Sequence, residues 1–116
     1  MPSLALGTNS SALMAIGNDY GYENIFAREL DAIAKPNDIF IAISTSGSSK
    51  NIIKAIEKSK DLSLKFFIMT GSIGGICLKY KEHIINVPSN ETIIIQQLHI
   101  TIGHIICKLS EKEFLK

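Results

Sequence analysis

Hydroxyl side chains gather in one short stretch of the chain, Ser44-Thr45-Ser46-Gly47-Ser48-Ser49. The stretch follows an apolar run and precedes a helical pattern. Its backbone N–H groups would therefore lie at a helix N-terminus, where they lack intrahelical partners and favour an anion. No lysine or arginine occurs between Ile39 and Ser49. The pattern favours a sugar phosphate held by hydroxyls and dipoles over a nucleoside triphosphate, whose glycine-rich loop carries a lysine. An ordinary serine-rich turn with a helix N-cap explains the same residues equally well.

Other side chains with acid–base or ligand chemistry are scattered. Gln96 and His104 are eight positions apart on one helical pattern, about 12 Å along its axis. One metal ion bound by both would need stretched side chains, a distorted helix or ligands from a second subunit. From the pattern alone, His104 is interpreted as a core or interface histidine, and His99 as structural. Asp19 could equally pin the turn Gly17–Gly21. No spacing of cysteine and histidine indicates a structural zinc site.

Apolar patterns predict strands that alternate with helices. Strands are expected at Leu4–Leu6, Ile39–Ile43, Leu64–Met69 and His83–Val87. Helices are expected from an Asn9-Ser10-Ser11 cap to Ile16, over Glu23–Ala34, Ser49–Leu62 and Ile76–Tyr80, and over Thr92–Phe114 with Asn90 as a candidate cap. This alternation indicates an α/β layered fold with a mainly parallel sheet. Binding sites in such folds gather at the carboxyl ends of the strands, where the turns after Ile43 and Met69 would lie.

The composition is typical of one small folded domain. The chain has 116 residues, of which 46% are hydrophobic and 20% charged, which excludes a disordered chain. The net charge of +1 argues against a nucleic-acid partner. Cys77 and Cys107 are expected to be buried thiols in a reducing compartment. The apolar run Ile93–Leu109 is interrupted by polar residues, so it is expected to be too polar to span a membrane. Because the N-terminus also lacks a signal-peptide pattern, a cytoplasmic protein is expected.

Several segments, taken in order, resemble the sugar isomerase (SIS) domain of phosphoheptose isomerases, also called sedoheptulose 7-phosphate isomerases. They are Gly17-Asn18-Asp19-Tyr20-Gly21, Ser44-Thr45-Ser46-Gly47-Ser48-Ser49, Thr70-Gly71 with Gly74-Gly75, Val87-Pro88-Ser89, and Gln96 with His104. The resemblance covers nearly the whole chain. It implies one partial SIS domain over residues 1–116, with a three-layer, flavodoxin-like parallel sheet that lacks its first helices and first strand.

The resemblance implies a substrate and a reaction. Family members interconvert sedoheptulose 7-phosphate and D-glycero-D-manno-heptose 7-phosphate, a step of carbohydrate metabolism toward lipopolysaccharide. The catalytic acid–base group of the enediol mechanism would be His104, whose type of side chain suits a proton shuttle near neutral pH. The hydroxyl turn would bind the phosphate through Ser44, Thr45, Ser46 and Ser49. The sugar would be bound by Asp19 and Gln96.

The resemblance further implies a cofactor and an assembly. In zinc-bearing members the positions of Gln96 and His104 also ligate the metal, so one zinc ion per site and no nucleotide cofactor are expected. The helix Thr92–Phe114 is apolar nearly all round from Ile93 to Leu109, which favours burial on more than one side. A homotetramer with sites between subunits would provide the second covering surface, without a nucleic-acid or membrane partner.

Part of the family's catalytic apparatus has no counterpart in this sequence. Family members carry a Gly-Asn-Gly-Gly-Ser loop and a helix with the catalytic glutamate and a histidine ligand. Two positions also depart from the family pattern, with Ile94 in place of arginine and Gln97 in place of glutamate. The chain alone is therefore expected to be inactive, and poorly folded or rearranged at its N-terminal end. Alternatives are a non-catalytic SIS module that binds sugar phosphates or associates with the replication initiator, and a gene fragment without an independent role.

Overall fold

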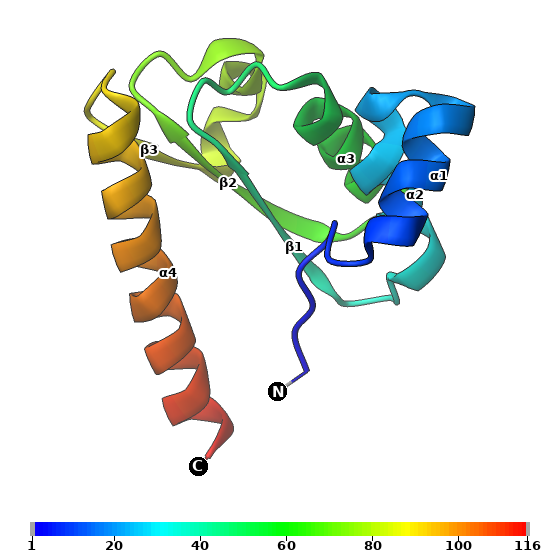
Figure 1. Ribbon diagram of the computed structural model, residues 1–116. Coiled ribbons are helices and arrows are strands. Elements are labelled where there is room, and N and C mark those ends of the chain that lie inside the picture. Colours follow the sequence, from blue (N-terminus) through cyan, green and yellow to red (C-terminus); the bar gives the residue numbers. More distant parts are fainter. Residues whose placement is uncertain (1, 116) are drawn as a thin grey trace.

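Three parallel strands form the sheet at the centre of the structure (Figure 1). In spatial order they are β1 (Ile39–Ser44), β2 (Lys65–Gly71) and β3 (Ile84–Val87), which is also their order in the chain. The computed structural model describes residues 2–115. In the register of the sheet, Ile41 lies opposite Phe67 and Ile68 lies opposite Ile84. The predicted α/β fold with a parallel sheet is confirmed.

The helices lie on two sides of this sheet. Helix α3 (Lys50–Asp61) connects β1 to β2 and contacts both, and the 3-10 helix η2 (Gly75–His83) connects β2 to β3. Farther out, α3 packs against α2 (Ile25–Ile33), which follows α1 (Ser10–Tyr20) and the short η1 (Tyr22–Asn24). Helix α4 (Thr92–Phe114) contacts β2 and β3, and Figure 1 shows it on the side of the sheet away from α3.

The hydrophobic core lies between α3, η2 and the even-numbered positions of the strands. Ala42, Phe66 and Ile68 point into it from the sheet and meet Ile56 of α3 and Cys77 of η2. Burial of each large apolar side chain contributes about 1.5–3 kcal/mol relative to its exposure. The isoleucines of α3 thus face this core, with Ile56 fully buried and Ile52 and Ile53 half-buried against it.

The odd-numbered positions of β1 and β2 form a second face that is only partly covered. Met69 is buried, but Ile39, Ile41, Ile43 and Phe67 keep between 41 and 59% of their surface exposed. Strand β1 pairs with β2 alone among the residues that the structure describes, so its other edge carries backbone groups without a strand partner. The third layer of the expected three-layer fold is therefore present only at the β2–β3 end, as α4.

Three local predictions are wrong. Leu4–Leu6 is not a strand but an irregular segment whose Leu4 is largely exposed, because no neighbouring strand is there to pair with it. Residues 17–20 continue α1 instead of forming a turn, and the helix ends at Gly21, whose φ of 88° interrupts the helical geometry. Asn90 does not cap α4, since the cap position is Glu91 and the Asn90 amide oxygen instead accepts a hydrogen bond from the Ser72 hydroxyl.

The exposed surface of α4 is rich in apolar side chains. By length and composition alone, this 23-residue helix is apolar enough to cross a membrane, so the expectation that it is too polar is wrong by that measure. Helices buried in the cores of soluble proteins meet the same criterion, and α4 packs on the sheet through the buried side chains of Ile95 and His99. Most of its remaining surface has no covering layer within residues 2–115.

The two cysteines provide a test of this fold. Cys77 is fully buried in the core, as expected, and desolvation raises the pKa of its thiol. Cys107 is exposed on α4, so the expectation that it is buried is wrong, because its part of the helix has no covering layer within residues 2–115. Because the thiolate is the reactive form, we expect one thiol per chain to react quickly with Ellman's reagent and the second only on unfolding. Cys107→Ser should remove the fast phase and leave the slow one. Two equally fast thiols in the native chain would contradict the packing of η2.

Candidate functional site

The hydroxyl turn between β1 and α3 is held together by its own polar groups. The Ser44 hydroxyl lies beneath the turn, accepts a hydrogen bond from the Gly47 N–H and donates one to the Ser49 hydroxyl, both at 3.2 Å. The Ser46 hydroxyl accepts one from the Ser48 N–H. Ser49 occupies the cap position of α3, but its side chain makes no capping hydrogen bond. The turn is therefore not an ordinary N-cap. No hydroxyl caps the first amides of α3, of which the Ile52 N–H donates to the Asn51 amide oxygen at 2.9 Å.

A second glycine-rich loop, which follows β2, supports the hydroxyl turn from below. The Gly71 N–H donates to the Thr45 carbonyl at 3.0 Å, and the Cys77 N–H donates to the Gly47 carbonyl at 3.1 Å. Gly47 and Gly75 have φ values of 63° and 51°, in the left-handed region that favours glycine. A Cβ on Gly47 would overlap the Gly74 carbonyl, and a Cβ on Gly75 would overlap the turn itself. The two loops pack backbone against backbone, which is possible only without side chains.

The loop after β3 joins the same cluster. The Ser72 N–H donates to the Ser89 carbonyl at 2.9 Å, and the Asn86 amide donates to the Gly71 carbonyl at 2.8 Å. The Ser72 hydroxyl also donates a hydrogen bond to the Asn90 amide oxygen, which links the loop after β2 to the loop after β3. The carboxyl ends of all three strands thus converge in one hydrogen-bonded cluster, the location in a parallel sheet where ligands bind.

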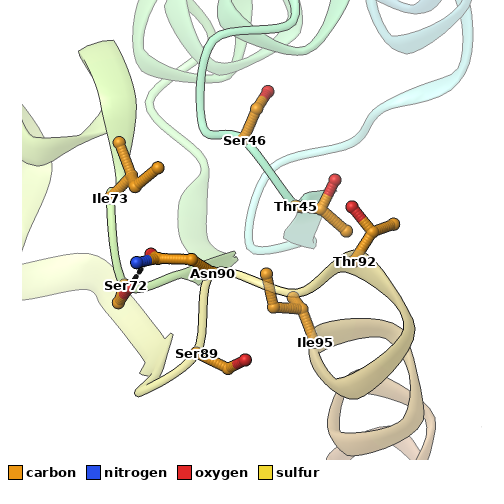
Figure 2. Close-up of a pocket in the computed structure, with 9 residues that line it drawn as sticks. Thr45, Ser46, Ser72, Ile73, Ser89, Asn90, Thr92 and Ile95 are labelled. Carbon is orange, nitrogen blue, oxygen red and sulfur yellow. Dashed lines mark hydrogen bonds between the residues drawn. The ribbon is translucent and has the colours of Figure 1, made fainter.

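A pocket of about 130 Å³ opens at this cluster. Its walls come from four segments, the three loops and the start of α4, and Figure 2 shows Thr45 of the first loop opposite Thr92 of the helix. The lining is Thr45, Ser46, Gly71, Ser72, Ile73, Ser89, Asn90, Thr92 and Ile95. No charged or titratable side chain belongs to this lining. The pocket can therefore bind a polar ligand through hydroxyls, an amide and backbone groups, but it offers no acid or base.

The structure brings only some of the sequence-predicted site residues together. Thr45 and Ser46 line the pocket, whereas Ser44, the last residue of β1, and Ser49, at the cap position of α3, do not. Gln96 is exposed and lies one helical turn beyond Thr92, on the same side of α4.

His104 and Asp19 lie away from this pocket. His104 is exposed, twelve residues beyond the Thr92 position, which is about 18 Å along the helix axis. Asp19 is exposed near the end of α1, where it accepts a hydrogen bond from the Asn18 amide at 2.8 Å. The roles of His104 and Asp19 in a common site stay predictions, because neither residue lines the pocket within one copy of the chain.

The residues described do not fit a zinc ion. Zinc in proteins is held by three or four donors in a tight shell. No group of three histidine, cysteine, aspartate or glutamate side chains within residues 2–115 could hold a metal ion. Gln96 and His104 lie on one continuous helix, two turns apart and both exposed. Any metal bound by this pair would need additional donors from another segment or from a second copy of the chain.

The sequence reasoning missed most of the pocket wall. Ser72, Ser89, Asn90 and Thr92 line it, yet none was singled out as a ligand. A signal was present, because these residues follow the second and third strands directly and polar side chains after parallel strands converge at one edge. In the sequence alone, Ser72 and Ser89 look like ordinary turn residues, Asn90 like a helix cap and Thr92 like the first residue of a helix.

Comparisons with known proteins point to one family. The SIS domain family model matches residues 1–71. A phosphoheptose isomerase of Aneurinibacillus thermoaerophilus is 51% identical over 116 residues, which is 100% of this chain and 59% of that protein. One of Helicobacter pylori (strain Shi470) is 46% identical over 98% of this chain and 59% of its own length. The chain thus spans about three-fifths of the length of these curated relatives.

Solved structures agree with the sequence relatives. The phosphoheptose isomerase GmhA from Neisseria gonorrhoeae superposes with a TM-score of 0.87 at 37% identity, covering 91% of this chain and 60% of that one. A phosphoheptose isomerase from Francisella tularensis gives a TM-score of 0.88 at 35% identity, covering 92% and 58%. Three-fifths of each solved chain therefore has the same arrangement of elements as described above.

The loop packing predicts the outcome of one substitution. Gly47→Ala should lower the free energy of unfolding by at least about 2 kcal/mol, because its methyl group would overlap the Gly74 carbonyl at a left-handed φ. The matched control is Gly103→Ala in α4, where a Cβ meets nothing within 4 Å. There alanine should stabilise by about 0.5–1 kcal/mol. Urea unfolding measures both, and equal effects would contradict the loop geometry.

Proposed function

Since the chain belongs to the SIS domain family, we propose that it binds a phosphorylated sugar at the carboxyl ends of its strands. The motif resemblance to phosphoheptose isomerases is confirmed by the relatives that carry that name. In our proposal the phosphate sits at the hydroxyl turn Ser44–Ser49 and the uncapped start of α3. The sugar extends into the neighbouring pocket, where Ser72, Asn90 and Thr92 meet its hydroxyl groups.

The observation that carries this proposal is the lining of the pocket. A sugar presents many hydroxyls and no apolar face large enough to fill an apolar cavity, and it is recognised by short polar side chains that both donate and accept. The pocket offers hydroxyls from all three strand ends and from α4. The phosphate's charge would be met by the α3 dipole and by the N–H groups of its first turn that no hydroxyl caps, because such groups stabilise anions at helix N-termini.

The reaction that fits this ligand is an aldose–ketose isomerisation, as in the named relatives. One base removes a proton from the carbon next to the carbonyl and returns it to the neighbouring carbon through an enediol. A second group moves a proton between the two oxygens, and no co-reactant is consumed. We assign the oxygen-to-oxygen shuttle to His104 and substrate contacts to Gln96 and Asp19, on the strength of the sequence motifs.

The position of His104 favours a site shared between copies of the chain. It lies about 18 Å along α4 from the pocket wall at Thr92, too far to reach a sugar bound there in the same copy. A second copy that packs against the exposed apolar side of α4 would bring its own His104 or Asp19 to the pocket. We therefore propose a homo-oligomer, with the family's tetramer as the expected form. Zinc would belong to such a shared site only if another segment supplies further donors.

A non-catalytic role is favoured by a separate observation. The pocket lining contains no carboxylate, histidine, lysine or cysteine, so a ligand can be held there without a base to start the reaction. The chain alone would then bind a sugar phosphate and act as a sensor or partner module. If another segment or another chain supplies the family's catalytic glutamate, the chain would take part in catalysis. The substrate we then favour is sedoheptulose 7-phosphate, a precursor of the heptose in lipopolysaccharide. Such a phosphorylated sugar is confined to the cytoplasm by its charge.

Calorimetry tests the binding proposal. We expect the intact chain to bind sedoheptulose 7-phosphate and not the unphosphorylated sugar. Ser46→Ala should weaken binding about tenfold or more, because a hydrogen bond to a charged group is worth about 1.5–3 kcal/mol. Ser10→Ala, an exposed serine at the start of α1, should leave the affinity unchanged. Equal binding by both variants would show that the turn does not hold the phosphate.

Deuterium exchange separates catalysis from binding. Incubated with sedoheptulose 7-phosphate in D₂O, the chain alone should incorporate no deuterium at the carbon next to the carbonyl, because no base lines the pocket. Proton NMR of the sugar measures this directly. If the purified protein does incorporate deuterium into the sugar and His104→Ala abolishes it, the expected inactivity is contradicted and the chain catalyses the proton transfer by itself.

A further inference from the structure

Two hydroxyl side chains lie on neighbouring strands beneath the hydroxyl turn. Ser44 ends β1, and Thr70 is its register partner in β2. Thr70 continues the row of Phe66 and Ile68, so its side chain points to the side of the sheet on which α3 lies. Its hydroxyl lies directly under Gly47, because a Cβ added to that glycine would be only 3.0 Å from the Thr70 Oγ1. The Thr70 hydroxyl thus forms part of the floor of the turn.

This hydroxyl is a buried polar group without a partner. Thr70 is fully buried, and its Oγ1 has no hydrogen-bond partner within residues 2–115. Buried polar groups in native proteins are nearly always paired, and an unpaired one destabilises the fold. A valine would fill the same space without an unmet polar group. The threonine is therefore explained if its hydroxyl acquires a partner in a second state of the turn.

The Ser44 hydroxyl offers an acceptor for the Thr70 proton. A hydroxyl oxygen has two lone pairs and one proton. In the structure the Ser44 Oγ accepts the Gly47 N–H with one lone pair and donates its proton to the Ser49 Oγ, both at 3.2 Å. Its second lone pair is therefore open to a donor. Because neighbouring strands lie about 4.8 Å apart, a rotation of the Thr70 side chain can bring its hydroxyl within hydrogen-bond distance of the Ser44 Oγ.

Ser49 extends this line of hydroxyls to the surface. It is exposed at the cap position of α3, and its side chain makes no capping hydrogen bond. Because its oxygen accepts the proton of Ser44, its own proton is available to a ligand at the start of the helix. The line thus runs from the fully buried Thr70 through the buried Ser44 to the exposed Ser49. An anion that accepts from Ser49 would orient all three protons outwards, and each donation would strengthen the next.

We propose that Thr70 is a positioning residue of the phosphate site, whose hydroxyl completes a hydrogen-bond chain when phosphate binds. In this chain Thr70 donates to Ser44, Ser44 donates to Ser49, and Ser49 donates to a phosphate oxygen. The inference rests on the proposed function, because the anion is the phosphate that we assign to the turn. Thr70 does not touch the phosphate. It acts through Ser44, and the hydrogen bond that its hydroxyl lacks in the free chain is made in the complex.

Two substitutions separate the hydroxyl of Thr70 from the shape of its side chain. Thr70→Val keeps the shape and removes the hydroxyl. Its affinity for sedoheptulose 7-phosphate in calorimetry should fall about three- to tenfold, while the urea midpoint of the free chain stays the same or rises. Thr70→Ser keeps the hydroxyl and loses a buried methyl group, so its urea midpoint should fall while its affinity is retained. The matched control is Thr101→Val at an exposed position of α4, which should change neither quantity.

A double-mutant cycle tests the chain of hydroxyls itself. Ser49→Ala should weaken binding, and Thr70→Val should cause no further loss in the Ser49→Ala background, because the chain is already broken there. The inference is overturned if the two losses add or if Thr70→Val binds as tightly as the wild-type chain, and in both cases the proposed function stands. It is also overturned, without any ligand, if Thr70→Val lowers the urea midpoint, since the hydroxyl is then already paired in the free chain. A wild-type chain that binds no phosphorylated sugar overturns the proposed function and this inference together.

Discussion

The contact of the hydroxyl turn with the glycine-rich loop after β2 determines the geometry of everything around the pocket. Two backbone hydrogen bonds join the loops, through the carbonyls of Thr45 and Gly47, and glycines stand where any side chain would separate them. The turn can therefore keep its hydroxyls at the surface while its backbone is fixed from beneath. Preorganisation of this kind matters most for neutral donors, because each hydroxyl contributes little unless its position is already set before the ligand arrives.

A pocket without charged residues has consequences for how a phosphate would be recognised. Lysine or arginine would attract any anion over a long range, whereas helix amides and hydroxyls act only within the first turn of the helix and at hydrogen-bond distance. Recognition then depends on shape and on the number of hydroxyls that the ligand presents. The same neutrality separates binding from chemistry, because the groups that position the ligand cannot move its protons. Catalysis by such a framework requires side chains brought in by another segment or another copy.

The sequence sufficed for most of the regular structure because the controlling interactions are local. The alternation of strands and helices, the boundaries of α3 and α4 and the parallel sheet follow from apolar periodicity and from glycine and proline positions. Leu4–Leu6 was predicted as a strand because its residues are apolar, but a strand also requires a neighbour to pair with. The turn predicted at Gly17–Gly21 is wrong for a different reason, since a single glycine and asparagine do not stop a helix, and α1 ends only at Gly21, whose φ is 88°.

The site was harder to predict than the fold for a physical reason. Thr45 and Ser46 were found because the turn concentrates many hydroxyls in six residues. Ser72, Asn90 and Thr92 come from three separate segments, and only the register of the strands brings them together. The role of His104 rests on a motif, and its distance from the pocket became a constraint only once the structure placed the pocket at Thr92, at the start of the predicted helix and twelve residues before His104.

The absence of a side chain at Gly71 has one further effect, on the orientation of α4. Ile95 rests directly on that backbone near the first turn of the helix, while the other end, near Phe114, extends roughly 30 Å away. The helix therefore contacts the sheet near its start, next to the pocket, and its other end extends away from the sheet. A tilt of α4 about this contact would therefore move the residues near Phe114 farther than those beside the pocket.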